Sequence, residues 1–233
     1  MKTLSVKECV SFGWKTFWSR PWLFVAAGVI VFLVNVAISV PQSFIDRLSE
    51  TAQGTPDGMS LALAAFTISV IGGVLSVFLQ MGTTRFFLKA HDTTSDTRLH
   101  DLIYLRSFWR YVGASILVFF AVLLGFLLLI VPGIIASIAL SFALYLVIDK
   151  GLGPVEAFKQ SLALTKGHRW SLFFLALATL GLNILGLLAL VIGLLVSVPV
   201  SMLAMLHAYR LLSATNTETD PTSENLESIP VAA

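Results

Sequence analysis

The stretch YVGASILVFFAVLLGFLLLIVPGIIASIALSFALYLVI, residues 111–148, contains no charged residue over 38 positions. A helix that crosses the hydrocarbon core of a bilayer needs about 20 apolar residues. The stretch is therefore too long for one crossing and long enough for two. Pro132 and Gly133 lie near its middle, where a proline and a glycine favour a tight turn. The sequence predicts two spanning helices joined as a hairpin at this pair.

The rest of the chain extends the same pattern. Hydrophobic residues make up 57% of the 233 residues and charged residues only 12%, whereas soluble domains carry about 25% charged residues. This composition excludes a soluble globular protein and a disulfide-built secreted domain. It predicts an all-α integral membrane protein with six transmembrane helices in three hairpins, within one domain over residues 1–212. The spans are predicted near 22–40 (closed by Pro41), 61–81, 111–131, 133–149, 171–187 and 190–212.

The basic residues are distributed unevenly along these predicted spans. Of the 15 Lys and Arg residues, 14 fall on one side of the six-span topology, and only Arg47 falls on the other. Because Lys and Arg are enriched in short cytoplasmic loops, both termini are predicted to be cytoplasmic. The residues predicted to anchor the inner interface are Trp14, Trp18, Trp22, Trp109, Trp170, Arg110 and Arg169.

Each predicted hairpin follows a segment that mixes apolar, aromatic and basic residues. Val6, Val10, Trp14 and Phe17 share one helical face before the first hairpin. The segments 102–112 and 155–170 precede the other two. We expect all three to form amphipathic helices in the inner interface, where their basic residues attract anionic lipid headgroups. The last segment, 213–233, is acidic and without apolar periodicity, so it is predicted to be a disordered cytoplasmic tail.

A few polar side chains lie inside the predicted spans. They allow two interpretations, close helix packing or a polar groove between hairpins, and both stay open at this point. The candidate residues are Ser137, Ser141, Asn183, Ser197, Ser201 and His207. Two asparagines, Asn35 and Asn183, are expected to bridge helices.

The sequence offers little catalytic chemistry. No Asp, Glu, Lys or Arg lies well inside a span, which argues against a proton-coupled pump. No nucleophile elbow, phosphate-binding loop or dinucleotide fingerprint is present, and the single cysteine, Cys9, has no redox or metal pattern. An interfacial lipid enzyme would need His91, Asp92 and His100 to converge. We therefore predict no catalytic, cofactor or metal site and no nucleic-acid partner; the oligomeric state is left open.

The second half of the chain carries a recognisable pattern. Its features are the Val131-Pro132-Gly133 turn, Asp149-Lys150, the helix Ala157…Ser161…Thr165, and the closing run 196–212 with Tyr209-Arg210. In these features residues 127–176 and 196–212 resemble the YciC-like family of uncharacterised bacterial multi-pass inner-membrane proteins. Similar runs occur in the membrane domain of some glycerophosphodiester phosphodiesterases. The resemblance implies a six-span bundle in a bacterial inner membrane and brings no catalytic residues with it.

Three functions follow as hypotheses. The first is a non-enzymatic membrane accessory or scaffold component that acts at the cytoplasmic face through lipids or a protein partner. The second is a transporter of a small molecule or lipid through a groove between hairpins. The three segments that enter the hairpins are alike in composition, which suggests a threefold helix-plus-hairpin repeat, and transporters often arise from repeats. The third is the interfacial lipid-modifying enzyme.

Overall fold

The computed structural model describes residues 5–51, 58–92, 97, 107–189 and 193–218. This part of the chain is helical and contains no strand. Six of its helical segments are long and apolar enough to cross a membrane, which confirms the prediction of an all-α multi-pass membrane protein. The chain divides into two compact units, and each is described here by itself. Unit 1 comprises 1–19 with 109–233, and unit 2 comprises 20–108.

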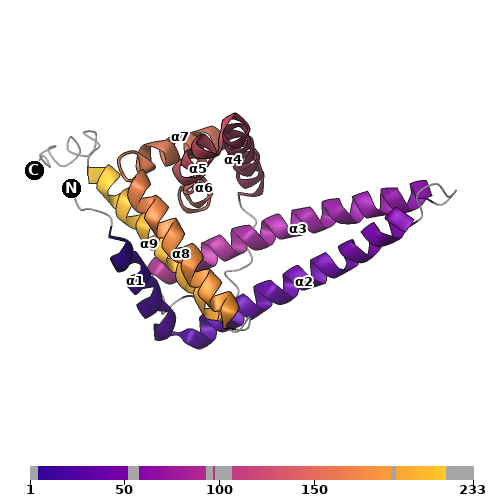
Figure 1. The fold of residues 1–233 in the computed structure, drawn as a ribbon, viewed down its shortest axis with the longest axis horizontal. Coiled ribbons are helices and arrows are strands. Elements are labelled where there is room, and N and C mark those ends of the chain that lie inside the picture. Colours follow the sequence, from indigo (N-terminus) through magenta and orange to yellow (C-terminus); the bar gives the residue numbers. More distant parts are fainter. Residues whose placement is uncertain (1–4, 52–57, 93–96, 98–106, 190–192, 219–233) are drawn as a thin grey trace, which may run out of the picture. The chain divides into compact units, whose positions relative to one another are not determined.

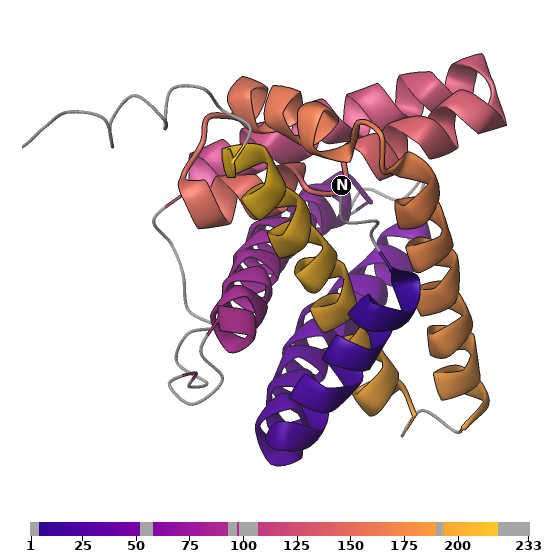
Figure 2. The ribbon, with the colours of Figure 1, turned by 90° about the vertical axis from the view of Figure 1, so that its left-hand side faces the viewer.

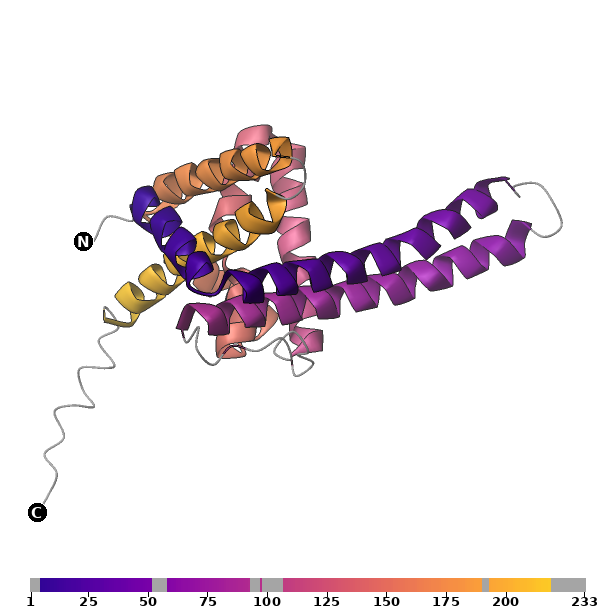
Figure 3. The same cartoon turned by 90° about the horizontal axis from the view of Figure 1, so that it is seen from below.

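Unit 2 consists of two long helices, α2 (Pro21–Thr51) and α3 (Gly58–Asp92), which lie side by side (Figures 1 and 3). Near one end Phe24 packs against Phe86 and Phe87, with ring centroids 6.1 and 6.0 Å apart. Further along, Gln42 Nε2 donates a hydrogen bond to Ser69 Oγ at 3.3 Å.

The expectation that Pro41 closes the first span is wrong, because α2 continues through this proline to Thr51. A proline inside a helix removes one backbone hydrogen bond and bends the helix without always ending it. Most of the connection 41–60 between the first two predicted spans is therefore helical, and its residues 52–57 lie outside the described part of the chain.

Unit 1 is built around α9 (Leu194–Glu218), which packs against both α8 (Arg169–Leu188) and α1 (Val6–Ser19). Figure 2 shows α1 beside α9 in this unit. The remaining helices are α4 (Phe108–Leu128), α5 (Ile130–Ala139), α6 (Ala143–Lys150) and α7 (Pro154–Thr165). Helices α5 and α6 together form one candidate span, interrupted at 140–142.

The turn before α5 differs from the sequence prediction. The chain reverses at the extended residue Leu129, and Pro132 and Gly133 lie inside the first turn of α5. A proline is tolerated there because its missing N–H would have no helical partner. Gly133 has another role: a Cβ at this position would meet the Phe126 ring, and its own backbone lies against Gly125. Gly133 thus allows close packing between α4 and α5. The turn is made at Leu129, the residue directly before α5.

Helix α1 buries a face that the sequence pattern only partly predicted. Cys9, Gly13 and Phe17 are buried, and a Cβ on Gly13 would overlap the carbonyl oxygen of Val200 in α9. Small residues allow such close approach between helices. Trp14 and Trp18 remain exposed on the opposite surface.

The acidic segment 213–233, predicted to be disordered, begins in a helix, because α9 continues through residues 213–218. Ser213 is buried at the start of this segment. Residues 219–233 lie outside the described residues, as do 102–106 of the second expected interfacial helix. The grouping of the spans into three hairpins stays a prediction.

Candidate functional site: a polar cluster around Asp149

Asp149 lies in the last turn of α6, where the backbone prepares a sharp exit. Gly151 ends the helix in the left-handed conformation, with φ of 64°, which glycine adopts at little cost. Pro154 then begins α7, and the Glu156 side chain accepts a hydrogen bond from the Gly153 N–H at 3.2 Å. These local signals place Asp149 at the junction of α6 and α7.

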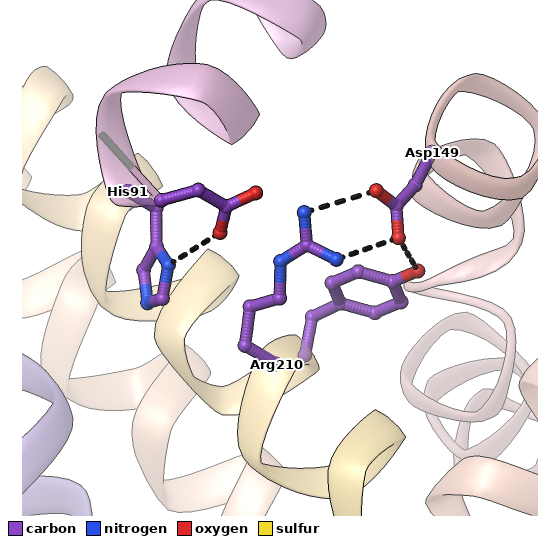
Figure 4. Close-up of polar contacts among 5 residues, drawn as sticks. His91, Asp149 and Arg210 are labelled. Carbon is purple, nitrogen blue, oxygen red and sulfur yellow. Dashed lines mark hydrogen bonds and ion pairs between the residues drawn. The ribbon is translucent and has the colours of Figure 1, made fainter. Parts of the chain in front are cut away.

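The carboxylate of Asp149 binds two residues of α9. Arg210 Nη1 donates to Asp149 Oδ2 at 2.7 Å, and Arg210 Nη2 donates to Asp149 Oδ1 at 2.9 Å. The Tyr209 hydroxyl donates to Asp149 Oδ2 at 2.7 Å. Figure 4 shows the guanidinium facing the carboxylate in this two-point arrangement. Such a pair fixes both distance and orientation between its helices.

A group of aromatic rings adjoins this ion pair through Tyr209. The Tyr209 ring lies 5.8 Å from Tyr145 and 5.7 Å from Phe142, centroid to centroid, and the Arg210 guanidinium lies 5.6 Å from the Tyr209 centroid. The side chains of Asp149 and Arg210 are only 16% and 27% exposed. A partly buried, two-point ion pair is expensive to break from one side, so it holds α6 and α9 together.

A second contact set stabilises the interruption between α5 and α6. Ser161 Oγ of α7 donates to the Ala139 carbonyl at 2.9 Å, and Thr165 Oγ1 reaches the same oxygen at 3.3 Å. Both hydroxyls are fully buried. A carbonyl at a helix end lacks its usual partner, and the α7 hydroxyls supply one. The Ala157…Ser161…Thr165 pattern is thus the packed face of α7.

Helix α4 joins the same end of unit 1. Arg110 Nη1 donates to the Gly151 carbonyl, and a Cβ at Gly113 would come within 2.9 Å of Pro154. The cluster therefore ties α4, α6, α7 and α9 together at one end, and its geometry suits a rigid platform.

Exposed basic and aromatic side chains lie around this platform, and we name them the α7 rim. Trp109 and Trp170 are 82% and 76% exposed, and three basic side chains are also exposed. The α7 rim comprises Trp109, Lys159, Lys166, Arg169 and Trp170. On α7 itself Val155 is exposed and Phe158 and Leu162 are half-buried, so an apolar stripe accompanies the charges.

The structure separates the polar candidates predicted within the spans. Ser137 and Ser141 donate to the Ile134 and Ile138 carbonyls of their own segment. His207 stacks on Phe12 of α1, with centroids 4.1 Å apart. Ser137 and Ser141 are therefore engaged within their own segment, whereas His207 packs against α1.

The other three candidates belong to the packed helices α8 and α9. Ser197 and Ser201 are buried, at 3% and 9% exposure. Among the described residues, their hydroxyls and the Asn183 Oδ1 atom have no hydrogen-bond partner. A Cβ at Gly186 would overlap the Ser197 side chain, which shows how closely the two helices approach.

The predicted anchors are placed on the surface. Trp14, Trp18 and Trp22 are exposed, as Trp109 and Trp170 are, and so are Arg110 and Arg169.

Of the cluster of His91, Asp92 and His100 considered for a lipid enzyme, only His91 and Asp92 lie within the described residues. His91 Nδ1 lies 3.1 Å from Asp92 Oδ1 at the end of α3 (Figure 4), whereas His100 lies outside the described residues. Within the described ranges no three His, Cys, Asp or Glu side chains gather as metal ligands would.

Sequence reasoning did not predict the pairing of Asp149 with Arg210. The two residues are separated by 61 positions, and each looked like an ordinary charge at the end of a span. A usable signal existed, because an acid and a base end two different spans on the same predicted side.

Comparison with known proteins places the cluster within a shared region. Residues 111–216 match a family described as "Protein of unknown function (DUF975)", and this range contains Asp149, Tyr209 and Arg210, whereas Arg110 lies just before it. The chain is also 22% identical over 224 residues to "Uncharacterized protein Rv2560" of Mycobacterium tuberculosis (strain ATCC 25618 / H37Rv). That alignment covers 90% of this chain and 69% of the relative. No solved structure matches. The chain is therefore similar to proteins of unknown function.

Proposed function

We propose that this chain is a non-enzymatic accessory or scaffold protein that acts at the cytoplasmic face of the bacterial inner membrane. Its cytoplasmic working surface is the α7 rim, and the ligands are anionic lipid headgroups. Both termini are cytoplasmic in this proposal, in keeping with the distribution of 14 of the 15 basic residues. The relation to the YciC-like family and to phosphodiesterase membrane domains belongs to the same proposal.

The observation that carries the proposal is the rigid support beneath the α7 rim. Asp149 and Arg210 fix α6 to α9, and Ser161 fixes α7 to the α5–α6 interruption. Exposed charges on a fixed platform lose little freedom when they bind a surface, and indole rings favour the headgroup level. The packed face of α7 leaves Lys159 and Lys166 on the outside.

The test measures retention of anionic lipid by single-charge variants. Each basic residue near an anionic surface contributes about 1 kcal/mol, or about fivefold in affinity. We expect Arg169→Gln in nanodiscs to bind phosphatidylglycerol about fivefold less tightly, and Lys159→Gln with Lys166→Gln to add to the loss. The matched control is Arg47→Gln, an exposed arginine of α2, which should leave binding unchanged. Equal losses for Arg169→Gln and Arg47→Gln would contradict a localised headgroup site.

Transport through a groove is the second candidate, and one observation favours it. Among the described residues, Asn183 Oδ1 and the hydroxyl oxygens of Ser197 and Ser201 are buried along α8 and α9 without a hydrogen-bond partner, and a polar ligand would satisfy them. Native mass spectrometry should then detect a bound polar molecule that the double variant Ser197→Ala/Ser201→Ala loses. A protein that carries no such molecule, and that Asn183→Leu stabilises, would assign these residues to packing.

A further inference from the structure

The outer side of α7 carries apolar and basic residues in alternation. Positions 155, 159, 162 and 166 are three or four residues apart, so they follow one side of the helix and its cap, opposite the buried Ala157 and Leu164. These four residues are Val155, Lys159, Leu162 and Lys166. Arg169, where α8 begins, extends the basic part of the α7 rim.

The basic residues of the α7 rim lack a counter-charge in the same part of the fold. Among the described residues, Lys159, Lys166 and Arg169 form no ion pair. The two carboxylates nearest to them in sequence, Asp149 and Glu156, are already hydrogen-bonded. Three like charges on one surface create a positive potential that favours an anionic partner.

Unit 2 offers few carboxylates that would meet these charges. Among its described residues only Asp46, Glu50 and Asp92 are acidic. The first two lie on the side opposite to α7 in the predicted topology, and Asp92 Oδ1 lies 3.1 Å from His91 Nδ1. Covering the rim with an apolar helix pair would desolvate its charges without compensation, which is costly.

The chain itself supplies an acidic segment next to this surface. Residues 219–233 contain Asp220, Glu224 and Glu227 and no Lys or Arg. They follow α9, which contacts α7, and Figure 2 shows the end of α9 close to α7. About 15 extended residues reach about 50 Å, whereas α7, with 12 residues, is about 18 Å long. The segment is therefore long enough to reach the basic residues of the α7 rim.

We propose that residues 219–233 dock on the α7 rim and compete there with anionic lipid headgroups, so that the chain regulates its own lipid binding. Glu224, Leu226, Glu227 and Ile229 alternate acidic and apolar residues, as the outer side of α7 alternates basic and apolar ones. Tethering gives the segment an effective concentration in the millimolar range, so even weak ion pairs compete. This inference rests on the proposed function, because the segment covers the same lipid-binding surface.

The first test detects the contact without anionic lipid. The full chain in phosphatidylcholine nanodiscs is treated with a carbodiimide, which joins a carboxylate to a lysine amine in contact with it, and the links are mapped by peptide mass spectrometry. We expect links from Glu224 or Glu227 to Lys159 or Lys166 within one chain. Exchange of the lipid for phosphatidylglycerol should lower their yield at least about threefold, because headgroups then compete for the lysines.

Other cross-linking patterns would overturn the proposal. A map without links between the segment and the α7 rim would do so, as would links that form only between two chains. Links from the segment to Lys7, Lys15 or Lys89 in place of the rim lysines would assign it to a different surface.

The second test measures phosphatidylglycerol binding by a full-length variant that combines Asp220→Asn, Glu224→Gln and Glu227→Gln. We expect about 2- to 10-fold tighter binding, because the α7 rim then has lost its tethered competitor. Binding equal to that of the wild type would overturn the regulation.

The matched control combines Asp46→Asn, Glu50→Gln and Asp57→Asn, which changes the net charge by the same amount on the other predicted side. It should leave lipid binding unchanged, and an equal gain in this control would overturn the regulation by showing a general charge effect. If Arg169→Gln weakens lipid binding but the tail variant does not strengthen it, the regulation fails and the proposed function stands. If lipid binding depends neither on Arg169 nor on the tail acids, both fail.

Discussion

Removing the charge of Asp149 should destabilise unit 1 more than any other single charge neutralisation in the described chain. Asp149→Asn keeps an oxygen for the Tyr209 hydroxyl but leaves the Arg210 guanidinium without its carboxylate. Loss of one partner from a buried pair costs about 3–5 kcal/mol. Since these side chains are 16% and 27% exposed, water screens part of the effect, and we expect about 2–3 kcal/mol.

This loss corresponds to a decrease in Tm of about 4–12 °C for a chain of this size. Tryptophan fluorescence during thermal unfolding in detergent micelles measures it. The control Glu50→Gln changes an exposed carboxylate of α2 and should cost less than about 0.5 kcal/mol.

A double-mutant cycle separates the pair from its surroundings. If Asp149 and Arg210 act as one unit, then Asp149→Asn combined with Arg210→Gln should cost much less than the sum of the single losses. Arg210→Lys should lie between wild type and Arg210→Gln, because lysine keeps the charge and loses the two-point contact. Additive single losses, or a Tm for Asp149→Asn within about 1 °C of wild type, would refute the structural role of the pair.

Two further predictions concern helix contacts. Ser161→Ala should lower the free energy of unfolding by about 1 kcal/mol. Ser161→Ala combined with Thr165→Ala should lower it by about 2–3 kcal/mol, because the buried Ala139 carbonyl then has neither hydroxyl. Equal stability of both variants and wild type in the same thermal melts would contradict this prediction. Gly13→Ala should push α1 away from α9 and expose Cys9. Burial raises the pKa of the Cys9 thiol to about 11. Maleimide labelling at pH 8 should therefore be slow in wild type and at least about tenfold faster in Gly13→Ala. An unchanged labelling rate would mean that α1 stays in place.

Much of the fold could be predicted from the sequence, because hydrocarbon imposes a simple rule on composition. The 38 charge-free residues at 111–148 can only lie in apolar surroundings, and helices satisfy their own backbone there. Helix ends were less predictable. Pro41 and Pro132 both lie inside helices, since neighbouring contacts decide whether a proline ends a helix or only removes one hydrogen bond.

The candidate site was only partly predictable. Asp149, Ser161 and Arg210 were noticed as parts of a recognisable pattern, but nothing in the spacing said that they form contacts. Ser161 looked like one residue of a surface helix, yet it is fully buried against the α5–α6 interruption. Hydroxyls on an amphipathic helix bind whichever carbonyl the neighbouring chain offers, and a local pattern cannot contain that information.

The sequence by itself determined that this protein lies in a membrane and that its charges are concentrated at the ends of its spans. The reason is solvation: a charged or unpaired polar group in hydrocarbon is too costly to occur at random. Only the tertiary structure decided which of the remaining polar groups meet. It joined Asp149 to Arg210 across 61 positions and Ser161 to the Ala139 carbonyl across 22. Pairing depends on the distance and direction between side chains of different helices, and those are fixed by packing.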